Sequence, residues 1–295
     1  MERPNGMLKS KRAVNEESEK MKQNTIEKEV VLEGIGIHSG QKVTLKFLPA
    51  KEDQGIVFRR TDLSPVKEIS IKNFVFGKPE RCTVITNDGA QINTVEHLMA
   101  SLWALQIDNI IIEIDNIEVP GLDGSAMQYY EAVKRAGRIT QEAKRKQIKI
   151  KEPVFVNQNN AFIGLFPSDV FSVSYLLEHK HPAIGKQYLS LELTPEIVVD
   201  ELIFARTFCL KEEAEMLQKM GYGKGANTKN TLVMDVDGPM ENVLRFSDEL
   251  VRHKMLDLVG DMYLTNYPII AKVVAVNSGH AMNMEIIKQI KKIYC

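Results

Sequence analysis

The sequence predicts an α+β fold built from two similar units, one after the other. Two observations support this class. Segments with the alternating pattern of β-strands are followed by helical segments, and this order occurs twice along the chain. Between the two occurrences lies a polar and charged stretch at residues 138–146, RITQEAKRK, which we expect to be a linker. The chain has 295 residues, which is enough for two such units with buried cores.

Residues 1–24 precede the first pattern and are expected to carry no chemistry. They contain no apolar stretch, which excludes a secretory signal, and their several glutamates argue against a transit peptide. We interpret them as a disordered N-terminal extension, or as residues upstream of the true start. The first domain is therefore expected to span residues 25–140.

The first domain begins with strands and continues into helices. In KVTLKFLP, Val43, Leu45 and Phe47 alternate with polar residues, as in a half-buried strand. The segment TVEHLMASLWALQI has the apolar stripe of a helix, with Thr94 as its N-cap. A loop, PGLDGSA, leads into a second helix that should end at Gly137. The other strands expected in this domain are IEKEVVLEGIGIHSG, GIVFRR and NIIIEI.

The second domain, residues 147–295, repeats this order. A short helix, TPEIVVDELI, should be capped by Thr194, with Pro195 at its first position. The insert KEEAEMLQKM is helical and is closed by the glycine-rich GYGKG, and a longer helix starts after Ser247. A long apolar strand, YPIIAKVVAV, turns through NSGH into the last helix. The strands expected earlier in this domain are IKIKEPVFV, AFIGLFP, VFSVSYLLE and QYLSLEL.

Composition argues against several classes of function. A formal net charge of −1 gives no reason to expect nucleic acid as a partner. Cys82, Cys209 and Cys295 are widely spaced and form no CxxC pair, so neither a disulfide framework nor a cysteine-rich zinc site is expected. This usage fits a reduced, cytoplasmic setting. No apolar run approaches the roughly 18 residues of a membrane span.

Three polar residues in VRHKMLDLVGD form the first candidate site. His253, Asp257 and Asp261 are spaced by four, so at about 100° per residue they stack along one face of a helix. His253 and Asp257 can reach one ion, and zinc accepts both imidazole nitrogen and carboxylate oxygen. Asp261 lies too far along for that ion but could hold a second histidine. The alternative is a solvated helix face, but this helix is apolar on most sides and unpaired charge is costly to bury.

Glu96 and His97, directly after Thr94, form the second candidate site. Adjacent helical side chains point about 100° apart, so one can bind a metal while the other acts on the metal's water. The positive end of the helix dipole favours a neutral histidine with a free lone pair. A capping glutamate beside a surface histidine is the alternative.

Two further histidines lie at turns. His280, in NSGHAMN, follows an apolar strand and begins a helix, a place where catalytic groups recur, although it could also merely cap that helix. His38 lies in GIGIHSG, which is close to a dinucleotide-binding fingerprint. We reject that function because a strand follows, whereas a pyrophosphate needs a helix N-terminus there. A tight turn explains these glycines better and could deliver His38 into a pocket.

Taken together, seven motifs resemble the UDP-3-O-acyl-N-acetylglucosamine deacetylase family, from about Thr25 to near the C-terminus. The family supplies the committed deacetylation of lipid A biosynthesis. The resemblance implies two similar two-layer α/β sandwich domains, each a small sheet packed against helices with an inserted element, and an active site between them. The motifs are GIGIHSG, TVEHL, IDNIIIEI, PGLDGSA, ARTF, RHKMLDLVGD and SGHAMN.

The resemblance also implies a role for each site residue. His97, His253 and Asp257 would bind one catalytic zinc ion, with water as the fourth ligand. Glu96 would be the general base, and His280 would stabilise the oxyanion and protonate the leaving amine. The implied supporting residues are Asp261, which orients His280, Thr207, which donates to the oxyanion, and Lys254 and Phe208, which lie beside the substrate.

In the family an insert, here at about residues 205–232, forms an apolar passage for the acyl chain of the substrate. Met216, Leu217 and Met220 are candidates to line this passage, and their packing of the insert onto the protein is an equal alternative. Cys82 falls where members of the family can carry a cysteine near the site. It could bind a second, inhibitory metal or act as a small buried apolar side chain.

The expected partner is a UDP-linked acylated amino sugar. We expect a cytoplasmic monomer with no nucleic-acid partner and no stable membrane insertion. A zinc amidohydrolase for another N-acyl sugar is an alternative, because metal ligands specify chemistry better than substrate. A non-catalytic sugar-nucleotide binder is a further alternative, although a binder needs no general base.

Overall fold

Two five-stranded sheets form the outer layers of the molecule, and both have the same strand order and pairing. The computed structural model describes residues 22–78 and 81–295. In each sheet the third and fourth strands pair in parallel and all other neighbours are antiparallel. This shared topology confirms the predicted α+β class. In spatial order the first sheet is β2 (Val30–Ile35), β3 (Lys42–Pro49), β9 (Ile110–Ile114), β4 (Ile56–Arg60) and β5 (Lys67–Ser70), and the second is β12 (Val154–Gln158), β13 (Ala161–Phe166), β20 (Lys272–Val276), β14 (Ser172–Glu178) and β15 (Lys186–Glu192).

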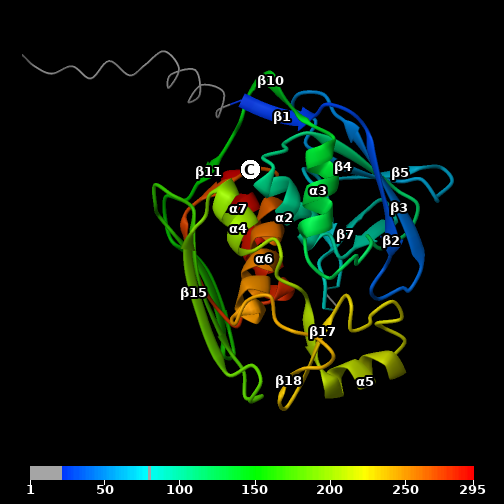
Figure 1. The fold of residues 1–295 in the computed structure, drawn as a ribbon. Coiled ribbons are helices and arrows are strands. Elements are labelled where there is room, and N and C mark those ends of the chain that lie inside the picture. Colours follow the sequence, from blue (N-terminus) through cyan, green and yellow to red (C-terminus); the bar gives the residue numbers. More distant parts are fainter. Residues whose placement is uncertain (1–21, 79–80) are drawn as a thin grey trace, which may run out of the picture.

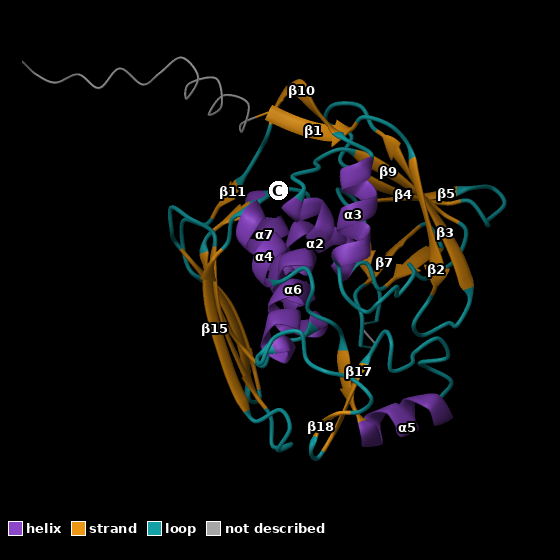
Figure 2. Ribbon diagram, viewed as in Figure 1, coloured by secondary structure: helices purple, strands orange, loops and turns teal. Residues whose placement is uncertain are grey.

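Helices fill the space between the two sheets (Figures 1 and 2). The pair α2 and α6 lies at the centre, and α6 also packs on β14 and β15 while α7 packs on β12 and β13. Every residue of α2 is buried, and six of its nine residues are apolar, as burial on all sides favours. The central helices are α2 (Glu96–Ala104), α3 (Met127–Arg135), α4 (Pro195–Glu201), α6 (Glu249–Tyr263) and α7 (His280–Tyr294).

The backbones of α2 and α6 touch where the helices cross. A Cβ atom added to Gly260 of α6 would lie 1.9 Å from the carbonyl oxygen of Glu96 and 3.1 Å from the amide nitrogen of Ala100. Only glycine permits this approach. The crossing therefore brings the start of α2 against the polar stripe of α6.

Shorter strands join and flank the two layers. The helix α5 (Lys211–Lys219) belongs to the predicted insert and lies apart from the central helices, near β17 and β18 (Figure 1). The insert thus forms a small unit of its own. The short strands are β1 (Lys22–Ile26) with β10 (Arg138–Lys144), β11 (Ile148–Lys149) with β19 (Ile269–Ile270), β6 (Val75–Phe76) with β7 (Val84–Asn87) and β8 (Ala90–Asn93), and β16 (Phe208–Leu210) with β17 (Leu232–Asp235) and β18 (Gly238–Pro239).

The predicted extension and linker both contribute to a strand pair, which corrects two expectations. Residues 22–24 of the supposed tail lie in β1, whose Asn24 is buried and donates its amide N–H to Asp108 Oδ2 at 2.9 Å. The polar stretch after Gly137 is largely strand β10, antiparallel to β1. Its side chains are mostly exposed, so no apolar alternation marked it in the sequence. The rest of the predicted tail lies outside the described residues, and the division into domains at 25–140 and 147–295 stays a prediction.

Two local predictions were also wrong. Thr94 does not cap α2, because its φ of 65° is left-handed and Val95 occupies the N-cap position without a side-chain bond. The Thr94 hydroxyl instead donates to Glu118 Oε1 at 3.3 Å. The predicted strand YPIIAKVVAV is interrupted at Ala271 and divides into β19 and β20. By contrast, the Thr194 cap with Pro195 behind it is confirmed, and so is the end of α3 at Gly137, whose φ is 73°. None of the described helices is long and apolar enough to cross a membrane.

Candidate active site

A cavity of about 290 Å³ opens beside the crossing of α2 and α6. Its polar wall comes from the first turn of α2, from α6 and from the first residue of α7, whereas β16 and α5 supply much of the remainder. Residues from both halves of the chain therefore share one cavity. The polar or titratable residues in the wall include His38, Arg81, Glu96, His97, Thr207, Glu213, His253, Lys254, Asp257 and His280.

Two histidines and one aspartate converge in the wall. Asp257 Oδ1 lies 3.3 Å from His97 Nε2 and 3.4 Å from His253 Nε2, and all three side chains are buried. The two imidazole rings stand nearly perpendicular, with centroids 5.0 Å apart. One ligand atom from each residue lies within 4.8 Å of the others, so the three can hold one metal ion.

The surroundings of this cluster suit a divalent cation. Asp257 Oδ1 is buried and has no hydrogen-bond partner among the described residues, although it faces two imidazoles. His253 Nδ1 lies 3.2 Å from the carbonyl oxygen of Ala205, a contact that places the proton on Nδ1 and the lone pair on Nε2. Burial lowers the pKa of His253 to about 3, so this ring is neutral near pH 7. The unpaired oxygen and the lone pair therefore point to the same place.

Asp257 is held in its charged form. Burial alone would disfavour the carboxylate, but the positive charges of Lys254 and His280 help to hold the pKa of Asp257 well below its usual range. The Lys254 ammonium lies 2.6 Å from Asp257 Oδ2, on the oxygen that does not face the imidazoles. One carboxylate oxygen is thus paired with lysine and the other is left for an ion.

Glu96 lies beside this cluster, but its carboxylate contacts Thr83 and faces His280 rather than the two other imidazoles. Its carboxylate is buried, and burial raises its pKa, against the opposing charge of His280. The amide N–H of Thr83 donates to Oε2 at 3.1 Å, while Oε1 lies 3.7 Å from His280 Nε2. A carboxylate with a raised pKa that faces a cavity can accept a proton near neutral pH.

His280 is charged although only 10% of its side chain is exposed. Burial lowers its pKa, but the carboxylates of Asp261 and Glu96 outweigh burial and raise the pKa of His280 to about 9. Its Nδ1 lies 3.0 Å from Asp261 Oδ2, which also accepts from the Asn283 side-chain amide at 2.9 Å. The opposite nitrogen, Nε2, points toward Glu96 and Asp257. His280 is thus a cation whose free N–H faces the cavity.

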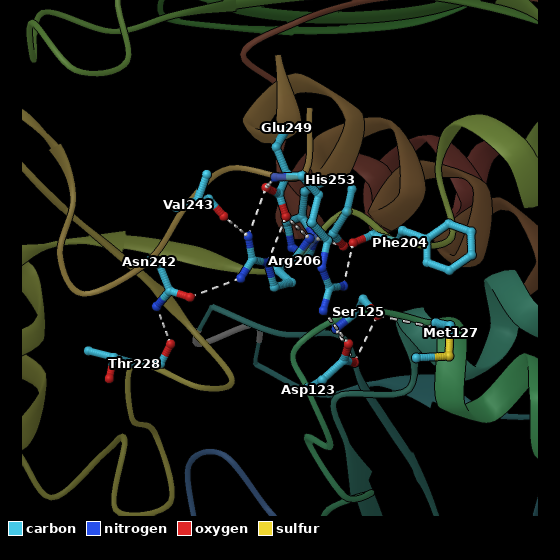
Figure 3. A network of polar contacts seen from close by, with 12 residues as sticks. Asp123, Ser125, Met127, Phe204, Arg206, Thr228, Asn242, Val243, Glu249 and His253 are labelled. Atoms are coloured by element: carbon cyan, nitrogen blue, oxygen red, sulfur yellow. Dashed lines mark hydrogen bonds and ion pairs between the residues drawn. The ribbon is translucent and has the colours of Figure 1, made fainter. Parts of the chain in front are cut away.

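A buried ion pair between Arg206 and Glu249 holds the segment that contacts the His253 ring (Figure 3). Glu249, one helical turn before His253, is fully buried and accepts from the backbone N–H of Arg206 at 3.0 Å and from its Nε at 2.8 Å. The backbone N–H of Arg245 donates to the same carboxylate at 2.6 Å. Glu249 therefore fixes the chain next to Ala205, whose carbonyl orients the His253 ring.

Comparison with known proteins agrees with this geometry. Residues 23–292 match the model of the family described as LpxC: UDP-3-O-acyl N-acetylglycosamine deacetylase. The chain belongs to this deacetylase family. Three relatives named UDP-3-O-acyl-N-acetylglucosamine deacetylase come from Saccharophagus degradans, Pseudoalteromonas translucida and Chromobacterium violaceum. They are 39%, 37% and 35% identical to this chain, over 91%, 92% and 91% of it and over 91%, 90% and 90% of their own lengths.

The remaining residues that the deacetylase motifs suggested are distributed unevenly. Thr207, Phe208, His38, Lys254 and Leu217 line the cavity. Asp261 lies behind His280 and does not line it. Met216 and Met220, expected beside Leu217, are 52% and 63% exposed and do not line the cavity. Both lie on α5 or at its end, where the helix turns only some of its side chains inward.

Several residues in and around this candidate site were not predicted from the sequence. Thr83 contacts both Asp261 and His280, and Arg81 pairs with Glu213 of α5 at 3.0 Å across the cavity wall. Glu118 is buried and accepts the backbone N–H groups of His38 and Ser39. Arg81, Thr83 and Glu118 lie in irregular segments without a periodic pattern, so only their neighbours in the sequence could have indicated them. Cys82 is buried in the cavity wall, and burial raises the pKa of its thiol to about 12.

A second cavity of about 330 Å³ adjoins the first. Phe208, Glu213 and Lys254 line both cavities and form the wall between them. The second cavity extends along β14 through Tyr175 and Leu177. The candidate site is thus a group of polar side chains with a cavity on two sides.

Proposed function

We propose that this chain hydrolyses the N-acetyl group of UDP-3-O-acyl-N-acetylglucosamine, giving acetate and the free amine, the committed step of lipid A biosynthesis. The observation that carries the proposal is the convergence of His97, His253 and Asp257 in the cavity wall of a chain from this family. Three thiols without a disulfide partner support a reducing, cytoplasmic location. A monomeric state stays a prediction.

One zinc ion is the proposed cofactor, bound by His97, His253 and Asp257. Two imidazoles and one carboxylate are a donor set that zinc accepts, and three protein ligands leave a position for water or substrate. The orphaned Asp257 Oδ1 supports this assignment, because a buried oxygen without a donor is costly unless a cation satisfies it. Zinc, when bound, supplies a Lewis acid for the amide carbonyl and lowers the pKa of a water molecule.

Glu96 is the proposed general base. Hydrolysis of an amide needs a proton removed from the attacking water, and the Glu96 carboxylate faces the cavity with its Oε1 free of the Thr83 N–H. Its raised pKa makes it a better proton acceptor than an exposed glutamate. As the water attacks the carbonyl carbon, its proton passes to Glu96.

His280 is the proposed general acid. An amide nitrogen leaves only once it is protonated, and His280 carries a proton on the Nε2 that faces the cavity. Its charge also stabilises the oxyanion of the tetrahedral intermediate, together with the Thr207 hydroxyl. Asp261 accepts from Nδ1 and holds the ring in this orientation.

The two cavities fit a substrate that is branched at the sugar. Apolar side chains line the first cavity and suit an acyl chain. They include Ile37 of the GIGIHSG segment and Ala214 and Leu217 of α5. The second cavity, which Phe208 and Lys254 separate from the first, could hold the UDP group of the substrate. The Lys254 ammonium at this junction is complementary to an anionic group such as a diphosphate.

The decisive measurement combines metal content with turnover. We expect about one zinc per chain, release of acetate from the acylated UDP-sugar, loss of both after chelation and recovery on adding zinc. Free N-acetylglucosamine is the matched substrate. Equal turnover of both sugars would replace the proposed substrate by another N-acyl sugar, and zinc binding without any turnover would favour a sugar-nucleotide binder.

Two variants separate the metal from the base. Glu96→Ala should keep zinc and lose most turnover, since removal of a general base costs about 10²- to 10⁴-fold. His253→Ala should lose the metal itself, because only two of the three donors are left. A Glu96→Ala enzyme as fast as wild type would remove the base assignment.

A further inference from the structure

Thr83 connects the two catalytic sides of the site although it does not line the cavity. It lies between Cys82 and the first residue of β7 and is fully buried. Its backbone serves α2: the N–H donates to Glu96 Oε2 at 3.1 Å, and the carbonyl accepts the N–H of Thr94 at 2.9 Å. The carboxylate of Glu96 therefore depends on Thr83 for the orientation of one oxygen.

The side chain of Thr83 serves α6 and α7. Its hydroxyl donates to Asp261 Oδ1 in a short hydrogen bond and lies 3.0 Å from His280 Nδ1. Asp261 Oδ2 is taken by His280 and Asn283, so among the described residues the hydroxyl is the sole donor to Oδ1. The carboxylate that orients His280 is thus fixed at both oxygens, and one of them is fixed by Thr83.

We infer that Thr83 is a positioning residue that sets Glu96 and His280 relative to each other, an inference that rests on the proposed function. Glu96 and His280 come from helices that are 184 positions apart in the sequence, yet one residue contacts Glu96 through its backbone and the Asp261–His280 pair through its hydroxyl. Proton transfer at opposite ends of one amide requires these groups at a fixed separation. Thr83 supplies that constraint without touching the substrate.

The hydroxyl is the part of Thr83 that a substitution can isolate. Valine has the same shape and keeps the backbone N–H to Glu96, but it leaves Asp261 Oδ1 buried without a donor. Asp261 can then turn away from His280 to find another partner. Serine retains the hydroxyl and should restore the contact. If Thr83 only fills space, valine is the better replacement and serine the worse one.

The experiment compares Thr83→Val and Thr83→Ser with wild type on the acylated UDP-sugar. We expect Thr83→Val to lower kcat by about ten- to a hundred-fold, as for loss of a hydrogen bond to a buried charged group. KM and zinc content should stay unchanged, since Thr83 lines neither cavity. Thr83→Ser should recover kcat to within a few-fold of wild type. Thr265→Val is the matched control, because its buried hydroxyl donates to the carbonyls of Met262 and Tyr267, outside both cavities.

A second measurement is independent of turnover. In protein labelled with ¹⁵N-histidine, Thr83→Val should shift the ring resonances of His280, whereas Thr265→Val should not. A kcat within twofold of wild type, or a serine variant as slow as the valine variant, would overturn the role of Thr83. If wild type does not cleave the sugar, the proposed function fails and the His280 resonance alone decides whether Thr83 holds that ring.

Discussion

Two histidines of the same cavity differ in charge because their nearest neighbours differ. Burial lowers the pKa of His253 to about 3, because desolvation outweighs the charge of Asp257, while His97 and Lys254 lower the pKa further. The His280 side chain is also largely shielded from solvent, but the charges of Asp261 and Glu96 outweigh this and raise its pKa to about 9. One ring is thereby neutral and able to bind a metal, and the other is a cation able to donate a proton.

This difference predicts how the pH profile should respond to Asp261→Asn. The proposed reaction needs His280 protonated and Glu96 deprotonated, so kcat/KM should fall as pH rises through about 9 and as it falls through the raised pKa of Glu96. Replacing Asp261 removes a charge that raises the pKa of His280, so the basic limb should move to lower pH. Rates of wild type and variant measured from pH 5 to pH 10 test this shift.

The control for this profile is Asp169→Asn, which removes a carboxylate from an exposed pair with Lys149. It should leave both limbs in place. A basic limb that stays near pH 9 in Asp261→Asn would show that another group titrates there.

At the residue scale, helical spacing predicted much of the candidate site. His253 and Asp257 are four apart on an apolar helix, and the structure indeed buries both and turns them to one point. The distant contributions of His97 and His280 followed from the resemblance rather than from spacing. Thr83 could not be predicted, because a single threonine before a strand has no periodicity and its contacts are 178 and 197 positions away.

At the scale of elements, the ion pair of Glu249 with Arg206 stabilises the start of α6. Glu249 accepts several N–H groups of Arg206 and Arg245 and ties the helix to the segment before β16. Arg206 also donates to the side chain of Asn242 and to the carbonyl of Val243. The start of α6, which carries His253 and Asp257, and the chain that orients the His253 ring are therefore joined by one set of hydrogen bonds.

Glu249→Gln should disrupt this assembly. The variant keeps the shape but leaves the Arg206 guanidinium buried without its counter-charge, and breaking a buried pair on one side costs about 3–5 kcal/mol. We expect a lower unfolding free energy in urea and weaker zinc binding by competition with a chelator. Glu201→Gln is the control, since its pair with Arg252 is more exposed. Unchanged zinc affinity in Glu249→Gln would limit the ion pair to stability.

Elements with an apolar face were predictable and elements without one were not. The alternation of Val43, Leu45 and Phe47 corresponds to three buried side chains in β3. The strand β10 was missed because its side chains mostly face solvent, and its contacts with β1 are backbone hydrogen bonds and polar side-chain pairs such as Lys22 with Glu142, which leave no apolar pattern. The cap of α2 was misplaced because Glu118, 24 residues later, draws the Thr94 hydroxyl away from the helix.

At the scale of the whole molecule, the α2–α6 crossing sets the distance between the two halves of the site. Gly260→Ala should force the helices apart, because the added Cβ would meet backbone atoms of Glu96 that no side-chain rotation can move. Overpacking of this kind costs about 1–3 kcal/mol or more. We expect a lower melting temperature and a loss of zinc affinity together, measured by thermal unfolding and chelator competition.

Gly279→Ala is the matched control for stability. A Cβ added there meets nothing within 4 Å, and the backbone of Gly279 is extended. Its melting temperature should stay close to wild type. A Gly260→Ala protein as stable as Gly279→Ala would mean that the crossing can relax without harm.

The three donors of the proposed metal site are shared unequally between the repeated halves of the fold, with His97 on one side and His253 and Asp257 on the other. A cation bound by all three donors would link the two halves, and the protein could not unfold without releasing it. Added free zinc should therefore raise the melting temperature of wild type. At a hundredfold excess of zinc over Kd, the free energy of unfolding should increase by about 2.7 kcal/mol. The His97→Ala variant lacks the donor from the first half, so the same zinc titration should leave its melting temperature nearly unchanged.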